Sequence, residues 1–375
     1  MNPQAQYGAD VIMRANYALE HGTEALSMCV RKAVNEMLGS LAEDAGIRRE
    51  DVFQVCVVGN TCMHHLFLGI SPASLVHAPY IPAVSERLVL NAGDYGLAVQ
   101  ERAELIMLSD IAGYVGADTC GCLLAIRQDQ QEEISLMIDI GTNGEMVLGN
   151  RERMVTCSTA AGPAFEGAKI ECGMRGAAGA VDHVKYEDGK WNYTTVGNKP
   201  AVGLCGSGLI DLVAGLLDAG MLDENGVLRS GQEKQGMFIL VPPERGGNER
   251  GVYLTQKDLG EVQLAKAAIA AGIQMLMERL GITEDDICSV YIAGAFGNYM
   301  DPVSAGKIGL LPATLVKKVM PVGNAAGEGA KIALVNEKEM LEMDELVRKI
   351  EFVELAASAD FQDHFIDELG FETGE

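Results

Sequence analysis

Residues 139–144, DIGTNG, combine an acidic side chain, a hydroxyl and two glycines within one short segment. A turn built from Gly141, Thr142 and Gly144 exposes backbone N–H groups and a hydroxyl at one point, which suits a phosphate. Asp139 would repel a bare phosphate, so the combination favours Mg²⁺ between the carboxylate and the phosphate. The alternative from these residues alone is an ordinary hairpin with a tight turn.

Other motifs for phosphate or catalytic chemistry are absent from the sequence. No GxxxxGK[ST], no helix-opening GxGxxG and no HExxH occurs. Ser207, in the glycine-rich segment 203–208, lacks a GxSxG frame, and a helix N-cap is its plain role. The six histidines have no ligand spacing, and the nine scattered cysteines favour buried thiols over a zinc or iron–sulfur site.

The elements that must position residues 139–144 follow from the apolar pattern. Asn-Gly between the apolar runs 136–140 and 145–148 predicts a β-hairpin. Buried strands are expected at 55–58, 105–108, 154–157, 289–293 and 319–322, and helices at 115–126, 209–217 and 255–280. This alternation predicts an α/β protein with ligands at the carboxyl ends of its strands. Because the hairpin restarts the pattern, we expect two lobes, residues 1–130 and 134–375.

The charge balance excludes one class of partner. Lys and Arg number 29 against 53 Asp and Glu, a formal net charge of −24, which argues against nucleic-acid binding. There is no run of eighteen apolar residues, and the N-terminus has neither a basic nor an apolar signal region. We therefore expect a cytoplasmic protein without membrane contact.

Four segments together resemble the actin-like ATPase superfamily, which includes sugar kinases and heat-shock chaperones. IDIGTNGEMV resembles a phosphate hairpin of that superfamily, and VYIAGAFGN resembles its adenosine motif. GYVGADTCGCLLA, with Asp118, resembles the helix that carries the catalytic base in sugar kinases. The helix 262–280, with Gln263 and Lys266 on its first turns, resembles the one that lies over the base in chaperones.

Longer segments resemble one family more narrowly, the reductive activators of corrinoid proteins. They are NPQAQYGADVI, CSTAAGPAFEGAKIECGMRGAAGAV, GLCGSGLIDLVAGLLDAGM and YIAGAFGNYMDPVSAGKIGLLP. The resemblance implies a two-lobed actin-like fold that binds ATP and Mg²⁺. It also implies ATP-dependent reduction of an inactive Co(II) corrinoid protein to Co(I), which then accepts a methyl group.

The resemblance implies roles for particular residues. Asp139 would hold Mg²⁺ through water, and Glu145 would complete the surroundings of the metal or face solvent. Asp118 would orient the attacking water, with a helix-capping role as the alternative. Phosphate contacts are expected from Gly141, Thr142, Asn143 and Gly144, and from the helix start at Gly206, Ser207 and Gly208. Nucleoside contacts are expected from Gly294, Ala295, Phe296 and Gly297, and from Gln263 and Lys266.

Two departures from the family leave alternatives open. The family carries an iron–sulfur domain, yet no ferredoxin cysteine pattern is present, so electrons are expected from an iron–sulfur domain or protein elsewhere. The chain begins just after the place of the family's first phosphate hairpin, so the first lobe is expected to lack it. A nucleotide-dependent docking module without turnover and a small-molecule kinase remain alternatives, and homodimerisation is left open.

Overall fold

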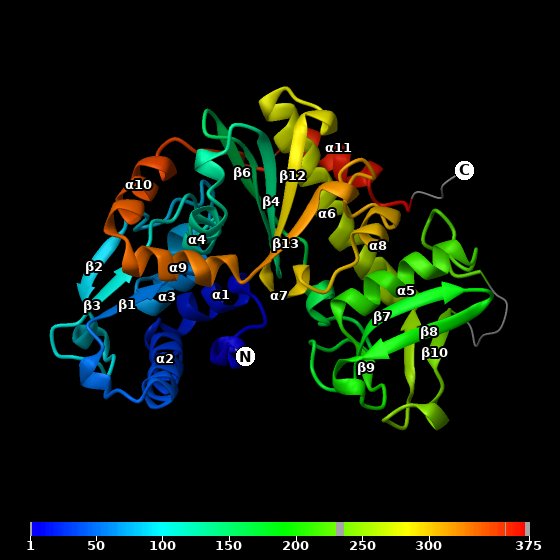
Figure 1. Ribbon diagram of the computed structural model, residues 1–375, viewed down its shortest axis with the longest axis horizontal. Coiled ribbons are helices and arrows are strands. Elements are labelled where there is room, and N and C mark those ends of the chain that lie inside the picture. The colour runs from blue at the N-terminus through cyan, green and yellow to red at the C-terminus, as the bar shows by residue number, and fades with distance from the viewer. Residues whose placement is uncertain (1, 230–235, 357, 372–375) are drawn as a thin grey trace. The chain divides into compact units, whose positions relative to one another are not determined.

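The computed structural model describes residues 2–229, 236–356 and 358–371 (Figure 1). It divides into two compact units, which are described separately. Unit 1 comprises residues 1–130 and 324–352, and unit 2 comprises residues 131–323 and 353–375.

Unit 1 is built on a small sheet with the strand order β1-β3-β2, in which β1 and β3 are parallel and β2 is antiparallel to β3. The strands of this sheet are β1 (Gln54–Val57), β2 (Leu88–Asn91) and β3 (Glu104–Met107), and β14 (Glu351–Phe352) also falls within the residues of unit 1 without joining this sheet. Its helices are α1 (Val11–His21), α2 (Glu24–Ala45), α3 (Thr61–Leu68), α4 (Ala117–Ile126), α9 (Ala325–Val335) and α10 (Glu337–Val347).

Residues 324–352 pack with unit 1, although the second lobe expected from the sequence, residues 134–375, includes them. The reason is a close crossing of α4 and α9, which lie side by side in Figure 1. A Cβ at Gly121 would lie 2.6 Å from the carbonyl oxygen of Ala326, and one at Gly329 would overlap the backbone of Gly121. Two glycines far apart in sequence thus let the helix backbones touch, and α9 packs in unit 1.

Unit 2 contains a mixed sheet whose order within the unit is β13-β12-β4-β5-β6. Strands β13, β12 and β4 are parallel, and β4, β5 and β6 form an antiparallel meander. The strands are β4 (Ile134–Ile140), β5 (Gly144–Gly149), β6 (Met154–Thr159), β12 (Ile287–Ala293) and β13 (Val319–Gly323). The predicted hairpin and strands of this sheet are confirmed.

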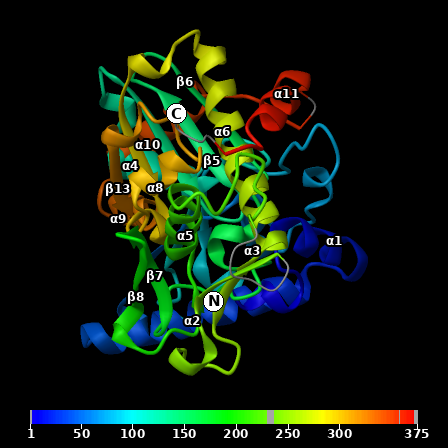
Figure 2. The same ribbon diagram turned by 90° about the vertical axis from the view of Figure 1, so that its right-hand side faces the viewer.

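Two smaller sheets complete unit 2. The first has the order β8-β7-β9, with β7 (Ala180–Glu187), β8 (Lys190–Thr195) and β9 (Gly203–Leu204), and the second is the hairpin of β10 (Met237–Val241) and β11 (Val252–Thr255). The helices are α5 (Gly206–Asp218), α6 (Gln256–Leu280), α7 (Gly294–Gly297), α8 (Pro302–Lys307) and α11 (Ala359–Asp367). Helix α5 packs against β7 in both views (Figure 1, Figure 2).

Helix α6 begins and ends as its sequence predicts. Thr255 and Asp258 form a capping box, in which the Asp258 carboxylate accepts hydrogen bonds from the backbone N–H and the hydroxyl of Thr255. Gly281 ends the helix in the left-handed conformation. Buried side chains of α6, including Ile269 and Ile273, join those of β4 and β5 in one core. The helix therefore supports the sheet from which the 139–144 turn emerges.

Candidate nucleotide site in unit 2

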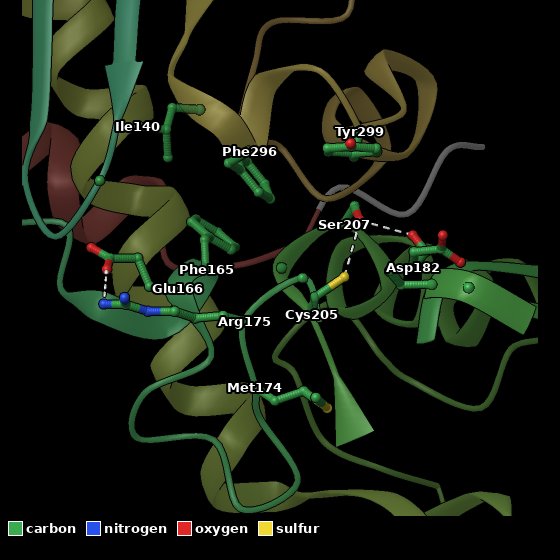
Figure 3. Close-up of a pocket in the computed structure, with 15 residues that line it drawn as sticks. Ile140, Phe165, Glu166, Met174, Arg175, Asp182, Cys205, Ser207, Phe296 and Tyr299 are labelled. Carbon is green, nitrogen blue, oxygen red and sulfur yellow. Dashed lines mark hydrogen bonds and ion pairs between the residues drawn. The ribbon is translucent and has the colours of Figure 1, made fainter. Parts of the chain in front are cut away.

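A cavity of about 650 Å³ opens in unit 2 at the end of β4 (Figure 3). Its walls come from the β4–β5 turn, the segment 165–176, β7, the turn at 196–197, the start of α5 and the segment 296–299. This volume lies within the range of about 300–1,000 Å³ that is usual for small-molecule sites. The cavity is therefore large enough for a nucleotide.

The β4–β5 hairpin supplies one wall of the cavity. Ile140 pairs with Gly144, so the turn proper is Gly141, Thr142 and Asn143, and the N–H of Gly141 donates to the carbonyl oxygen of Asn143 at 2.9 Å. The Oγ1 of Thr142 donates to Oε1 of Glu166 at 2.5 Å. Of this turn and its flanks, Ile140 and Gly141 line the cavity.

Asp139 and Glu145 are direct partners across the hairpin, so both side chains leave the same face of the sheet. Burial raises the pKa of the Asp139 carboxyl to about 6. Oε1 of Glu145 accepts a hydrogen bond from Oγ of Ser158 at 3.3 Å. Among the described residues no three His, Cys, Asp or Glu side chains form a group that would hold a metal by themselves.

The start of α5 forms a second wall of the cavity. Cys205 is the N-cap residue, and Cys205, Gly206 and Ser207 line the cavity, so the first backbone N–H groups of α5 lie at its edge. Oγ of Ser207 donates to the carbonyl oxygen of Asp182 at 2.8 Å. A Cβ at Gly206 would overlap the carbonyl oxygen of Phe165, and one at Gly208 would overlap that of Val181. Only glycine permits this close approach of α5.

The segment of the adenosine motif forms a third wall. Gly294 lies at φ +86°, and Phe296 lines the cavity from α7. The rings of Phe296 and Phe165 are stacked, with centroids 5.7 Å apart and planes 17° from parallel. Figure 3 shows the two side chains next to each other. A Cβ at Gly297 would lie 2.5 Å from Cγ2 of Ile292, so this glycine lets α7 fold back on β12. The side chain of Ala295 lies outside the described residues.

Several residues that line the cavity were not among the site residues predicted from the sequence. Phe165, Glu166 and Arg175 come from a segment that carries the family resemblance, but the resemblance assigns them no role. Nη2 of Arg175 lies 3.6 Å from Oε2 of Glu166. Asp182 and the exposed Tyr299 also line the cavity. The one available signal was an arginine among closely spaced glycines, because a glycine-rich loop with a cation is typical of an anion site.

Gln263 and Lys266 do not line the cavity, although the resemblance implies contacts with the nucleoside. Nε2 of Gln263 donates to the carbonyl oxygens of Asn225 and Leu369. Lys266 is fully buried, with Nζ 3.7 Å from Oε2 of Glu368 and 5.8 Å from the ring centroid of Phe371. In the structure both side chains contact the segment after α11, through Leu369 for Gln263 and through Glu368 and Phe371 for Lys266.

Asp118 lies in unit 1, in the first turn of α4. Its Oδ1 accepts a hydrogen bond from the N–H of Thr119 at 2.9 Å. The start of α4 is fixed by Asp110, whose Oδ1 accepts from the N–H of Ala117 at 2.9 Å. Because α4 is held in this way, the position of Asp118 at the helix start is set by backbone geometry.

All nine cysteines are free thiols. Burial raises the pKa of Cys157 above its usual range. In the part of the chain that the structure describes, we find no helix with the length and apolar content needed to cross a membrane.

Comparison with known proteins identifies close relatives. The corrinoid activation enzyme RamQ of Eubacterium limosum is 35% identical over 384 residues, which cover 98% of this chain and 64% of the relative. The [Co(II) methylated amine-specific corrinoid protein] reductase of Methanosarcina barkeri is 27% identical over 399 residues, covering 98% of this chain and 71% of the relative.

A solved structure, the reductive activator for corrinoid, iron–sulfur protein, superposes with a TM-score of 0.89 at 38% identity. The match covers 99% of this chain and 61% of that one, so the chain spans under two thirds of this protein and of the first relative. The expected α/β actin-like fold is confirmed, because a family model described as the C-terminal domain of RACo, the ASKHA domain, matches residues 133–375. A second model, the RACo middle region, matches residues 1–131. The chain therefore belongs to the RACo family of reductive activators.

Proposed function

We propose that the chain is the nucleotide-binding part of a reductive activator and that it binds ATP in the cavity of unit 2. One observation carries the proposal: a phosphate-type turn, a helix start and an aromatic pair meet around a single cavity of suitable size. The backbone N–H groups of Gly206 and Ser207, at the start of α5, then donate hydrogen bonds to the phosphates. The rings of Phe165 and Phe296 provide an apolar wall for the base.

The residues fit a magnesium ion that arrives with the nucleotide. Mg²⁺ is usually bound by one or two carboxylates together with waters and substrate phosphates, and not by a cage of protein ligands. Asp139 and Glu145 supply two carboxylates on one face of the hairpin. Asp139 is the stronger candidate, because burial makes its charge costly without a cation nearby. The ion itself would neutralise charge on the phosphates.

The proposed reaction is the reduction of Co(II) to Co(I) in a corrinoid protein partner. One electron is added to the cobalt, and we expect it from an iron–sulfur domain or protein outside residues 1–375. Hydrolysis of ATP to ADP and phosphate supplies the free energy for this uphill transfer. Asp118 is proposed to orient the attacking water. Support comes from the corrinoid-activating relatives and from the ASKHA match.

The first test is calorimetric titration of the chain with ATP, with and without Mg²⁺, alongside Asp139→Asn. We expect binding to the wild type that strengthens with Mg²⁺, and a smaller effect of Mg²⁺ in the variant. A corrinoid protein with Co(II) and an electron donor is then added, and Co(I) is followed spectroscopically. Binding without turnover would favour a docking module, and phosphorylation of a small molecule would favour a kinase. Absence of ATP binding at millimolar concentration would contradict the proposal.

A further inference from the structure

Glu166 places a negative charge beside the turn that is proposed to bind phosphate. Its Oε1 accepts the hydroxyl hydrogen of Thr142 at 2.5 Å, and its Oε2 lies 3.6 Å from Nη2 of Arg175. A Cβ at Gly141 would lie 3.9 Å from Oε1 of Glu166, so the carboxylate is adjacent to the turn. One carboxylate therefore engages a hydroxyl and a guanidinium that both suit a phosphate oxygen.

The backbone fixes this arrangement. The N–H of Gly162 donates to the carbonyl oxygen of Thr142 at 2.8 Å, which ties the segment after β6 to the hairpin turn. A 3₁₀ helix, Pro163–Glu166, follows directly and ends with Glu166. A Cβ at Gly167 would lie 2.5 Å from the backbone nitrogen of Met174, so the two arms of the loop are in backbone contact. Glu166 and Arg175 are thus brought together by the path of the chain.

In the nucleotide-free arrangement, acidic side chains outnumber basic ones in the cavity lining, and they would repel the phosphates of a nucleotide. Among the described residues that line it, Glu166 and Asp182 are acidic and Arg175 is basic. Asp182 already accepts a hydrogen bond from Oγ1 of Thr194 at 2.6 Å, outside the turn. Asp139 and Glu145 are proposed to meet the phosphates through Mg²⁺, whereas Glu166 lines the cavity beside the turn and is held there by Thr142. A polyphosphate would therefore meet the Glu166 charge directly, and two anions close together repel each other strongly when partly removed from water.

We infer that Glu166 is a phosphate surrogate, which holds Thr142 and Arg175 in the nucleotide-free protein and is displaced by a phosphate of the entering nucleoside triphosphate. The inference rests on the proposed function and adds two residues to it. Arg175 becomes the cation that binds phosphate, and Glu166 becomes an internal competitor that weakens nucleotide binding. No bond forms or breaks in this exchange, because only hydrogen-bond and ion-pair partners change.

The test is the affinity for ATP of Glu166→Gln, measured by calorimetry with and without Mg²⁺. Glutamine keeps an acceptor for the Thr142 hydroxyl and removes the charge, so we expect about threefold to tenfold tighter binding in both conditions. Arg175→Gln is expected to bind about tenfold more weakly. The matched control is Glu171→Gln, because Glu171 is exposed, accepts from the Tyr253 hydroxyl and does not line the cavity.

Unchanged or weaker ATP binding by Glu166→Gln would overturn the inference, and weaker binding only with Mg²⁺ would identify Glu166 as a metal ligand instead. Glu166→Ala is the second variant, expected to change affinity in the same direction, and thermal unfolding of both variants shows whether the fold is intact. If wild-type protein binds no ATP, the proposed function itself fails, which separates that result from a failure of the surrogate role.

Discussion

A Cβ atom on Gly294 would lie 2.9 Å from Oδ1 of Asp139. The two residues are 155 positions apart in sequence, and the parallel pairing of Ala293 with Asp139 brings them together. The carboxylate of the phosphate hairpin therefore lies directly against the turn at the start of the adenosine motif. Two motifs that the sequence presents separately share one edge of the sheet in unit 2.

The pKa of Asp139 predicts how the stability of the protein depends on pH. In the unfolded chain the pKa of an aspartic acid is about 3.9, and in the fold it is about 6. The native state binds the proton more tightly, so stability is lost as pH rises from about 4 to about 6 and is then constant. The variant Asp139→Asn has no ionisable group at this position and lacks this loss. Its free energy of unfolding should therefore exceed that of the wild type by about 2–3 kcal/mol at pH 7.

Urea unfolding of Asp139→Asn and wild type at pH 5, 6, 7 and 8 measures this difference. The difference in free energy of unfolding between the variant and the wild type should increase from pH 5 to pH 7 and stay level at pH 8. A difference that does not change with pH would contradict the raised pKa.

Gly294→Ala should destabilise the protein. Gly294 lies at φ +86°, where alanine is strained, and the new methyl group would press on Asp139. We expect a loss of about 1–3 kcal/mol of unfolding free energy. Gly260→Ala is the matched control, because Gly260 lies within α6 with open space around it, and this change should stabilise by about 0.5–1 kcal/mol. Denaturant unfolding that gives both variants the same sign would refute the argument.

Phe296→Leu should separate recognition of the base from that of the phosphates. The stacked pair of Phe296 and Phe165 forms the aromatic wall of the cavity. Loss of an aromatic contact of about 0.5–1.5 kcal/mol should weaken ATP binding about twofold to tenfold, while inorganic triphosphate should bind as before. Phe361→Leu, which removes a ring of the Phe361–Phe365 pair away from the cavity, is the control. Equal losses for ATP and triphosphate would show that Phe296 does not contact the base.

Lys266→Met should loosen the C-terminal segment without changing ATP affinity. Lys266 is buried beside Glu368 and Phe371, so its loss leaves Glu368 without this cation, at a cost of about 1–3 kcal/mol. Hydrogen exchange should increase in residues 359–371. Lys307→Met, which removes an exposed ion pair with Asp218, should change stability by at most about 1 kcal/mol. A large drop in ATP affinity for Lys266→Met would contradict this expectation and support the contact with the base that the resemblance implies.

Asp118→Asn tests the proposed orientation of water. If Asp118 positions the attacking water, the variant should hydrolyse ATP about 100-fold more slowly in the presence of the corrinoid protein. Its ATP dissociation constant should stay close to that of the wild type, because Asp118 is not assigned to binding. Hydrolysis by the variant at the wild-type rate would contradict the proposed role and would leave Asp118 a structural role at the start of α4.

The local parts of the site could be predicted because their causes are local. The apolar runs on either side of residues 141–143 predict a hairpin, and the structure confirms it, although Gly144 already pairs with Ile140 and the turn itself is Gly141–Asn143. The capping box at Thr255 and the stop at Gly281 bound α6 for the same reason. The α/β class follows from the alternation of strand-like and helix-like apolar patterns along the chain, each of which is recognised within a short window.

The sequence by itself thus determined the fold class, the hairpin and the family resemblance. Tertiary structure alone decided which side chains share the cavity and which residues belong to unit 1. Glu166 meets Thr142 and Arg175 through backbone contacts between separate turns, and α9 joins α4 through Gly121 and Gly329. Lys266 turned out to be a buried contact of the C-terminal segment. Such pairings depend on close packing between distant segments, and no local pattern of residue types encodes them.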